Sequence, residues 1–183
     1  MERKRMRADG QRNRDAILRA AAEVFARDGF DIALDRIAME AQVGRATLYR
    51  NFPNRSALAL AVFDENVVRF EQLAADTPET PNGFRRLFDA LAEDIANHAA
   101  LGQALAVADV EDDLTELRER VISTLDKFRL VAIATRELRP DVTRQDLELL
   151  LDTLGRGLSY GDRAQRQDRI ARLVALVFAG LEP

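Results

Sequence analysis

The stretch ALDRIAMEAQVGRATLYRNF, residues 33–52, decides the fold of this chain because it predicts two short helices separated by a tight turn. The first helix is expected over residues 35–41 and the second over about 45–52, with Gln42-Val43-Gly44 between them. Pro53 ends the second helix, since proline cannot continue the hydrogen-bond ladder. Two short helices joined by a three- or four-residue turn form a helix-turn-helix, which we place at 33–52. The apolar residues that face each other across the pair are Ile37, Ala38, Ala41, Val43, Leu48 and Phe52.

The second of these helices has a polar and basic outer face. A helix of about eight residues is roughly 12 Å long, which suits a DNA major groove about 12 Å wide. Arginine can read guanine, asparagine can read adenine, and threonine or alanine can contact a thymine methyl, whereas the hydroxyls of Thr47 and Tyr49 suit phosphate oxygens. A solvated basic helix face is the alternative interpretation. The outward residues are Arg45, Ala46, Thr47, Tyr49, Arg50 and Asn51.

Charge is distributed unevenly along the 183 residues. Residues 1–58 carry 12 Lys and Arg against 8 Asp and Glu, a net charge of +4, and the rest carries 15 against 23, a net charge of −8. Six of the basic residues lie within residues 1–14. A basic front on an acidic body is expected of a binding arm attached to a soluble domain. This arm could reach phosphates or an adjacent minor groove, and a disordered tail is an equal alternative.

The composition excludes several classes of site. The chain has no cysteine, which rules out disulfides, thiolate metal sites and a cysteine nucleophile. No apolar run approaches the length of a membrane span, and the basic N-terminus lacks the apolar run of a signal peptide, so we expect a cytoplasmic protein with no membrane partner. The acidic residues of 109–113 lack the spacing of a calcium loop and precede a helix, whose N-terminus favours carboxylates. The one histidine, His98, is expected at a helix end as a cap or surface residue. We expect no metal site, no cofactor and no catalytic residue.

Helical periodicity continues along almost the whole chain, so the predicted fold is all-α with about nine helices. Asn54 is a good N-cap for a fourth helix, and Thr80-Pro81 reads as the start of the fifth. Thr143 with Asp146 resembles a capping box. The expected helices are one ending at Asp28-Gly29, then 35–41, 45–52, 54–75, one from Pro81 past Ile95, 101–107, 113–137, 144–159 and 165–181.

The last two helices are apolar over more than half of their circumference, which requires burial on more than one face. In a chain of this size the second face most plausibly meets another subunit, as a four-helix interface around a twofold axis. The residues expected at this interface are Leu150, Leu154, Leu158, Leu173, Val177 and Leu181.

Apolar residues enclosed by the helices at 54–75, 84–95, 113–137 and 144–159 are candidates for a ligand pocket. For any single one of them, ordinary core is the stronger interpretation. The candidates are Phe70, Phe88, Leu91, Ile95, Leu125 and Phe128.

The window ALDRIAMEAQVGRATLYRNFPNRSAL, residues 33–58, resembles the signature of the TetR family of transcriptional regulators. It matches the family pattern at Ile37, Ala38, Ala41, Val43, Thr47, Leu48, Tyr49, Phe52 and Leu58. It departs from the pattern at Gln42, where a glycine is usual, so that the turn must accept a Cβ atom. Gly44 stands in place of a capping serine, Asn51 in place of a common histidine, and Arg55 in place of a phosphate-contacting lysine.

The resemblance implies a homodimer that binds a palindromic operator in double-stranded DNA and is released by a small-molecule effector bound to its C-terminal domain. We expect an N-terminal arm and three-helix DNA-binding domain over residues 1–56 and a larger helical ligand-binding and dimerisation domain over 57–183. A helical protein or enzyme that uses the pocket without regulating DNA is the alternative, and an adaptor that has lost DNA binding is a third. The residues expected at DNA are Arg36, Arg45, Ala46, Thr47, Tyr49, Arg50, Asn51 and Arg55.

Overall fold

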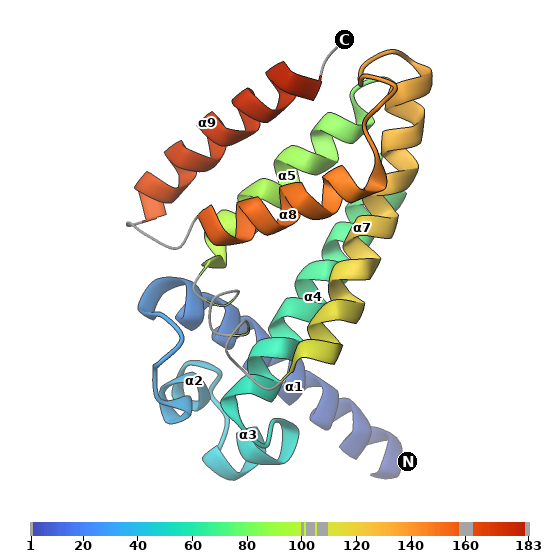
Figure 1. Cartoon of the computed structure of the whole chain (residues 1–183). Helices are drawn as coiled ribbons and strands as arrows, with labels where there is room; N and C mark the ends of the chain where they lie inside the picture. The colour runs from blue at the N-terminus through green and yellow to red at the C-terminus, as the bar shows by residue number, and fades with distance from the viewer. Residues whose placement is uncertain (1, 100, 102–104, 106–109, 158–162, 182–183) are drawn as a thin grey trace.

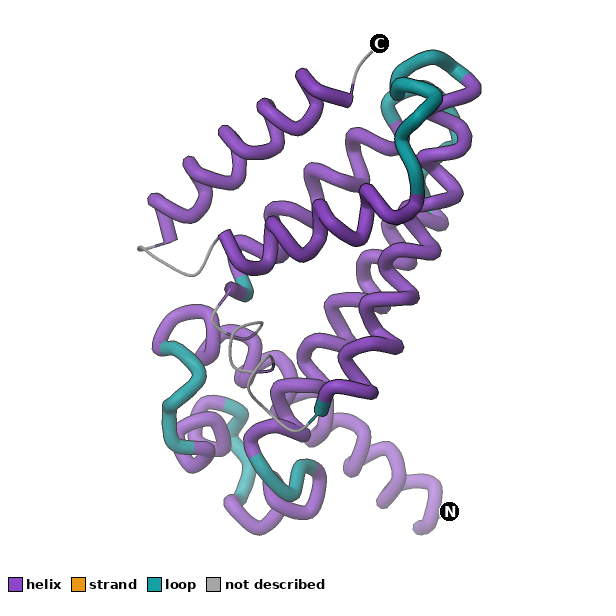
Figure 2. The backbone as a smooth tube through the Cα atoms, viewed as in Figure 1, coloured by secondary structure: helices purple, strands orange, loops and turns teal. Residues whose placement is uncertain are grey.

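The chain folds into α-helices joined by short loops. The computed structural model describes residues 2–99, 101, 105, 110–157 and 163–181, and within these ranges all regular structure is α-helical (Figure 2). The predicted all-α fold is confirmed, with eight helices in the described ranges against about nine expected, and the helix expected at 101–107 lies largely outside them. The helices are α1 (Glu2–Asp28), α2 (Leu34–Glu40), α3 (Arg45–Asn51), α4 (Arg55–Ala75), α5 (Gly83–Asn97), α7 (Glu111–Ala134), α8 (Arg144–Gly157) and α9 (Arg163–Leu181) (Figure 1).

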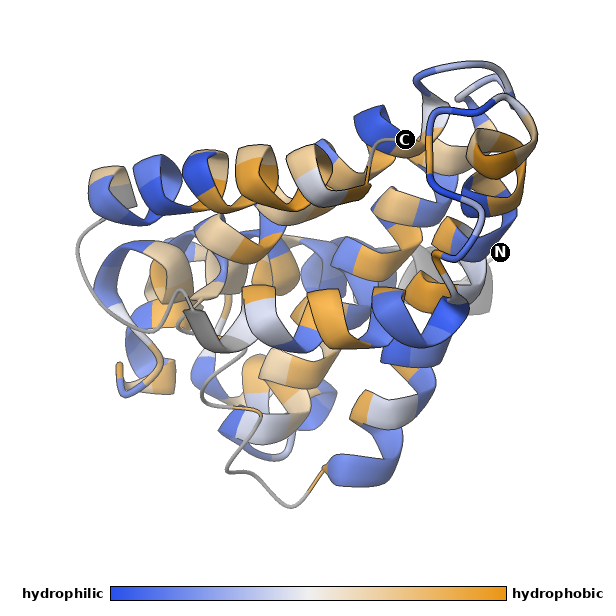
Figure 3. Cartoon of the chain, turned by 45° about the horizontal axis from the view of Figure 1, so that its top comes forward, coloured by the Kyte–Doolittle hydropathy of each residue, from blue (hydrophilic) through white to orange (hydrophobic). Residues whose placement is uncertain are grey.

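The helices bury two apolar clusters at opposite ends of the molecule. Helices α2 and α3 lie at one end against α1, whereas α5, α8 and α9 lie at the other (Figure 1). Hydrophobic and hydrophilic residues occupy different sides of the helices (Figure 3), as expected of helices with a buried face. We call the cluster around α1–α3 the N-terminal core; its residues are Ile17, Leu18, Ala20, Ala21, Val24, Phe25, Leu34, Ile37, Ala38, Leu48, Phe52, Leu58, Ala59, Val62, Leu101 and Leu105.

The second cluster, the C-terminal core, contains apolar residues of α4, α5, α7, α8 and α9. Three phenylalanines meet in it, since the ring of Phe178 lies 6.0 Å from that of Phe84 and 5.4 Å from that of Phe88, centroid to centroid. Such tilted and edge-on arrangements are favoured by the ring quadrupoles. One side of α9 is therefore buried against α5 of the same chain.

Helix α4 belongs to both cores. The side chain of Asn54 accepts a hydrogen bond from the N–H of Ala57 at 2.8 Å, which confirms the predicted N-cap. Val62 lies in the N-terminal core and Val67 in the C-terminal core. Between them the buried Asn66 accepts a hydrogen bond from Arg69, while its Nδ2 atom finds no partner among the described residues.

Helix α7 runs beside α4 (Figure 1), and one arginine ties the two together. Arg120 donates from Nη1 to Asp64 Oδ1 at 2.7 Å, and from Nε and Nη2 to the two carboxylate oxygens of Glu71 at 2.9 and 2.7 Å. The bidentate hydrogen bond from Arg120 holds the pKa of Glu71 below its usual value. Both acidic partners lie on α4, so the pair of helices is held in register along two turns.

Three segments differ from their expected structure. Helix α7, expected over 113–137, runs from Glu111 to Ala134. The basic residues at the N-terminus continue α1 as helix from Glu2, which fits a segment without proline that is rich in arginine. Helix α5 begins at Gly83 rather than at Pro81, because Asn82 takes a left-handed backbone, φ +71°, and its N–H donates to Glu137 Oε2 at 2.8 Å.

Candidate nucleic-acid interface

The turn between α2 and α3 is compact and closed by backbone hydrogen bonds. The N–H groups of Gln42 and Val43 donate to the carbonyls of Met39 and Ala38, each at 3.0 Å. Gln42 adopts φ +55°, the left-handed region in which glycine is favoured. Gly44 is the N-cap of α3 and makes no side-chain cap, as predicted from its missing hydroxyl.

Helix α3 is anchored by two apolar side chains. Leu48 is fully buried and Phe52 is 2% exposed, both within the N-terminal core. The guanidinium carbon of Arg14 on α1 lies 4.6 Å from the centroid of the Phe52 ring, a cation–π contact at the end of α3. The predicted inward face of this helix is therefore found, and α1 closes it.

The outer face of α3 presents the residues that were predicted to contact DNA. Arg45, Ala46, Tyr49 and Arg50 are exposed, whereas Thr47 and Asn51 are half-buried. Arg45, Ala46, Tyr49 and Arg50 fall at i, i+1, i+4 and i+5 and therefore share one side of this seven-residue helix. Arg36 lies on α2, and Arg55 is the first residue of α4.

Two polar side chains of α3, those of Arg50 and Asn51, donate hydrogen bonds to Thr47. Arg50 donates from Nη2 to the Thr47 hydroxyl at 3.0 Å, and Asn51 donates from Nδ2 to the Thr47 carbonyl at 2.8 Å. This bond uses one of the two N–H donors of the Asn51 amide, and the second donor and the Oδ1 acceptor are the groups that an adenine edge requires. Its base contact remains a prediction.

Carboxylates pair with three of the predicted DNA-contacting arginines. Arg45 Nε lies 3.1 Å from Asp35 Oδ1. The other two pairs, Arg36 with Asp28 and Arg55 with Asp31, are each separated by 3.4 Å between nitrogen and oxygen. The pKa of Asp28 is lowered, first by its hydrogen bond with Arg27.

These acidic partners were not predicted from the sequence. Asp28 and Asp31 flank the end of α1, and Asp35 lies in the first turn of α2, where a carboxylate is favoured by the helix dipole alone. A carboxylate at a helix N-terminus gives no indication that an arginine of another helix lies beside it.

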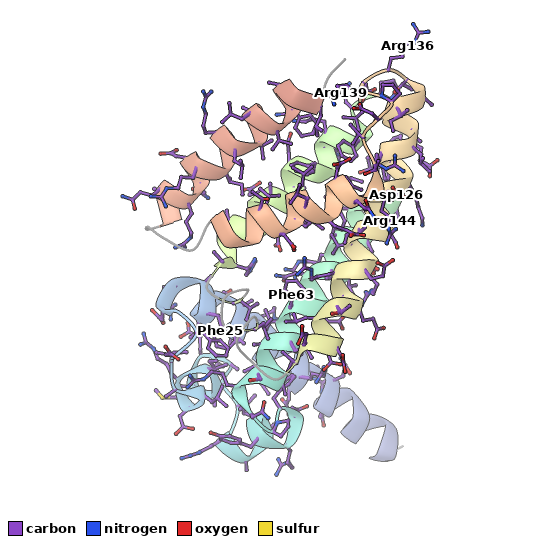
Figure 4. The ribbon with its side chains drawn as sticks, in the orientation of Figure 1. Phe25, Phe63, Asp126, Arg136, Arg139 and Arg144 are labelled. Atoms are coloured by element: carbon purple, nitrogen blue, oxygen red, sulfur yellow. The ribbon has the colours of Figure 1, made fainter. Side chains whose placement is uncertain are left out.

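The residues predicted to line a ligand pocket are brought together, but as core. Five of them are at least 93% buried within the C-terminal core, and Ile95 packs against it half-buried. A hollow of about 400 Å³ lies instead around the end of α7, and Arg136 on its rim is at the opposite end of the molecule from α3 (Figure 4). Its apolar walls, Phe84, Leu138 and Phe178, are themselves almost wholly buried and offer little surface to a ligand.

The predicted dimer residues divide by exposure. Leu154 is 1% exposed and belongs to the C-terminal core, so its assignment to a subunit interface is wrong: its side of α8 packs within its own chain. Leu158 lies outside the described residues. Leu150, Leu173, Val177 and Leu181 are half-buried against the same core. The exposed leucines of these helices are Leu149 on α8 and Leu176 on α9, 65% and 54% exposed.

Comparison with known proteins identifies the helix-turn-helix. The profile of the family described as bacterial regulatory proteins, tetR family, matches residues 17–62, which run from α1 into α4. The crystal structure of a TetR transcriptional regulator from Streptomyces coelicolor is 33% identical, and the match covers 93% of this chain and 98% of that one with a TM-score of 0.66. The chain belongs to the TetR family. A TetR transcription regulatory protein from Mycobacterium vanbaalenii, 26% identical over 97% of this chain and 99% of its own, has a TM-score of 0.72.

The curated relatives match over a shorter range. An HTH-type transcriptional regulator of Staphylococcus aureus (strain MRSA252) is 30% identical over 105 residues, which is 55% of this chain and 57% of the relative. Another, from strain USA300, is 34% identical over 76 residues, 39% of this chain and 41% of its own. The match with these curated proteins thus spans about half of their length or less. The structural matches cover 93% and 97% of this chain. None of the described helices is long and apolar enough to cross a membrane.

Proposed function

We propose that this chain is a DNA-binding transcriptional regulator that acts as a homodimer on a palindromic operator. The observation that carries the proposal is α3: Leu48 and Phe52 fix its inner side in the N-terminal core, while Arg45, Tyr49 and Arg50 stand exposed on the other. A short helix held rigidly with a basic outer face suits insertion in a major groove. A homodimer places two such helices on the two halves of a palindrome.

Direct selection of DNA tests this function. Fragments bound by the protein are recovered from a random-sequence library, and the affinity of the best duplex is measured over a range of salt concentrations. Affinity falls steeply with salt because the release of counterions accompanies phosphate contacts. Recovery of no sequence, or binding that salt does not change, contradicts the proposal.

Replacement of Arg50 separates base recognition from charge. Arg50→Ala is expected to lower the affinity for the selected duplex by about 10- to 100-fold, the range of one good base contact, with a much smaller loss on unrelated DNA. Arg86→Ala is the matched control, since Arg86 is an exposed arginine on α5 and lies outside the N-terminal half of the fold. Equal losses on both DNAs count against base recognition by Arg50.

We further propose that the regulator is a repressor released by a small-molecule effector. Membership in the TetR family supports an effector site in the C-terminal domain, and α4 is the natural transmitter because it joins both cores. An effector acts by binding one conformation better than the other. Compounds are screened for release of the selected duplex, and a compound that binds the protein without altering DNA affinity argues against this role.

A further inference from the structure

We propose that Asp35 is a positioning residue that orients Arg45 for end-on recognition of a guanine in the operator. The inference rests on the proposed function and deepens it, because it assigns one base type and one acidic side chain to the reading surface. Asp35 itself touches no base in this arrangement; it acts through Arg45.

Two side chains on different helices lie close to the guanidinium of Arg45. Its Nε atom lies 3.1 Å from Asp35 Oδ1, on α2. Its central carbon lies 5.6 Å from the centroid of the Tyr49 ring, one turn further along α3. A side chain with four rotatable bonds is thereby restricted while it remains 70% exposed.

The carboxylate of Asp35 approaches the guanidinium of Arg45 at its Nε atom. An arginine side chain has five N–H donors in a planar fork. The 3.1 Å contact is an ion pair at Nε and not a hydrogen bond from its N–H. It leaves the two terminal nitrogens Nη1 and Nη2 as a parallel pair. Such a pair matches the O6 and N7 acceptors of guanine. Arg45 is also the first residue of α3, and the N-terminal residues of a recognition helix are those that contact base edges.

The ion pair with Arg45 adds little to the stability that Asp35 gains from the dipole of α2, and its charge does not favour DNA binding. The Asp35 side chain is 49% exposed, and an exposed ion pair contributes only about 0–1 kcal/mol to folding. Its negative charge lies on a surface that has to approach phosphates, so it lowers affinity for any DNA. Orientation of Arg45 before binding is a benefit that offsets this cost, because less side-chain freedom is lost in the complex.

Arg50 provides an internal comparison. Within the described part of the chain it forms no ion pair and bonds only to the Thr47 hydroxyl. Its guanidinium is held by one neutral acceptor and by no carboxylate, and we expect Arg45 to impose the stricter base preference of the two.

The test uses the duplex selected by the wild-type protein and copies in which single guanines are replaced by 7-deazaguanine, which lacks the N7 acceptor. For wild type, one such replacement in each half-site is expected to weaken binding by about 10-fold or more. The same replacement should not change the affinity of Arg45→Ala, and this result identifies the guanine that Arg45 contacts. In Asp35→Asn the effect falls to roughly 3-fold or less, while affinity for unrelated DNA rises. Asp35→Glu, which keeps the carboxylate, restores part of the discrimination.

Asp31→Asn is the matched control. Asp31 is fully exposed on the same end of the molecule and pairs with Arg55, so the substitution removes the same charge without touching Arg45. It should raise affinity for all DNA and leave the 7-deazaguanine effect intact. Circular dichroism establishes that each variant is folded.

Two results overturn the inference. In the first, Asp35→Asn keeps the full loss of affinity on replacement of guanine by 7-deazaguanine. In the second, every guanine replacement that weakens binding by wild type weakens binding by Arg45→Ala as well. Both leave the proposed function standing, because wild type still binds the selected duplex in a salt-dependent way. Failure of wild type to select any DNA overturns the proposed function and the inference with it.

Discussion

At the scale of single residues, the turn of the helix-turn-helix contains a conformation that most side chains avoid. Gln42 takes φ +55° where glycine is usual in the TetR family. The left-handed region costs a residue with a Cβ atom roughly 1–2 kcal/mol. The flanking hydrogen bonds of Gln42 and Val43 to α2 hold this conformation in place.

Gln42→Gly is expected to stabilise the protein. Glycine removes the strain, but it also gives the unfolded chain more freedom, at a cost of about 0.5–1 kcal/mol, so the free energy of unfolding should rise by about 0.5–1 kcal/mol. Urea unfolding followed by circular dichroism measures the change. Gln42→Ala keeps the Cβ atom and serves as the control, with no gain expected. A lower stability for the glycine variant contradicts the strain argument.

The sequence pattern correctly predicted which side chains of the helix-turn-helix are buried. It predicted the exposed arginines but not the carboxylates that pair with them. Ile37, Leu48 and Phe52 are buried as predicted, because helical spacing determines which side chains share a face. The ion pair of Arg45 with Asp35 depends on how two helices cross, and ten residues separate the partners. Sequence spacing carries no information on that crossing, so the pair had to come from the structure.

At the scale of helices, local capping signals predicted most boundaries. Asn54 caps α4, and Thr143 with Asp146 forms a capping box at α8, since the Thr143 N–H donates to Asp146 Oδ2 at 2.7 Å and the Asp146 N–H to the Thr143 hydroxyl at 3.3 Å. The predicted start of α5 at Pro81 was wrong because the N–H of Asn82 donates to Glu137, 55 residues away. A boundary determined by a distant partner is not visible in local sequence.

The end of α5 makes the fold sensitive to pH. His98 is the C-cap of α5, and its Nδ1 lies 3.2 Å from Asp94 Oδ1. Burial alone lowers the pKa of His98, but the hydrogen bond and charge of Asp94 outweigh burial, so the pKa lies above the usual 6.5. A pKa raised by folding stabilises the protein below the unfolded value, and that stability is lost as pH rises through the folded value.

We therefore expect this contribution to the unfolding free energy to be complete below about pH 6 and to disappear at higher pH. Urea unfolding at several values between pH 5.5 and 9 measures the loss, and His98→Gln should show a flatter dependence over the same range. The chain has one histidine, so its imidazole signal in NMR reports the pKa without ambiguity. A pKa below 6.5, or an unchanged profile in the variant, argues against this account.

At the scale of the whole molecule, α8 and α9 bury one face in the C-terminal core and leave another in contact with solvent. Small residues lie along the exposed side of α9, at Ala171, Ala175 and Ala179, next to Leu176. Small side chains let helices approach closely. The sequence predicted two buried faces for these helices, and periodicity alone did not tell which face packs inside the chain.

Leu176→Glu is expected to break the proposed homodimer. Each dimer contains two copies of the residue, and burying a leucine contributes about 1.5–3 kcal/mol, so dissociation should be favoured by roughly 100-fold or more. Light scattering or sedimentation measures the mass in solution. Leu130→Glu on α7 is the matched control, since Leu130 is 56% exposed but lies on neither helix. A variant that remains dimeric at low micromolar concentration excludes this face.

The shared position of α4 restricts how hybrid regulators can be built from this chain. A junction at residue 56 would leave Leu58, Ala59 and Val62 out of the transplanted segment, although all three complete its N-terminal core. Leu101 and Leu105 complete the same core from beyond α5. A DNA-binding domain transplanted from this chain therefore has to include α4 as far as Val62. The recipient also has to supply apolar residues that match Leu101 and Leu105.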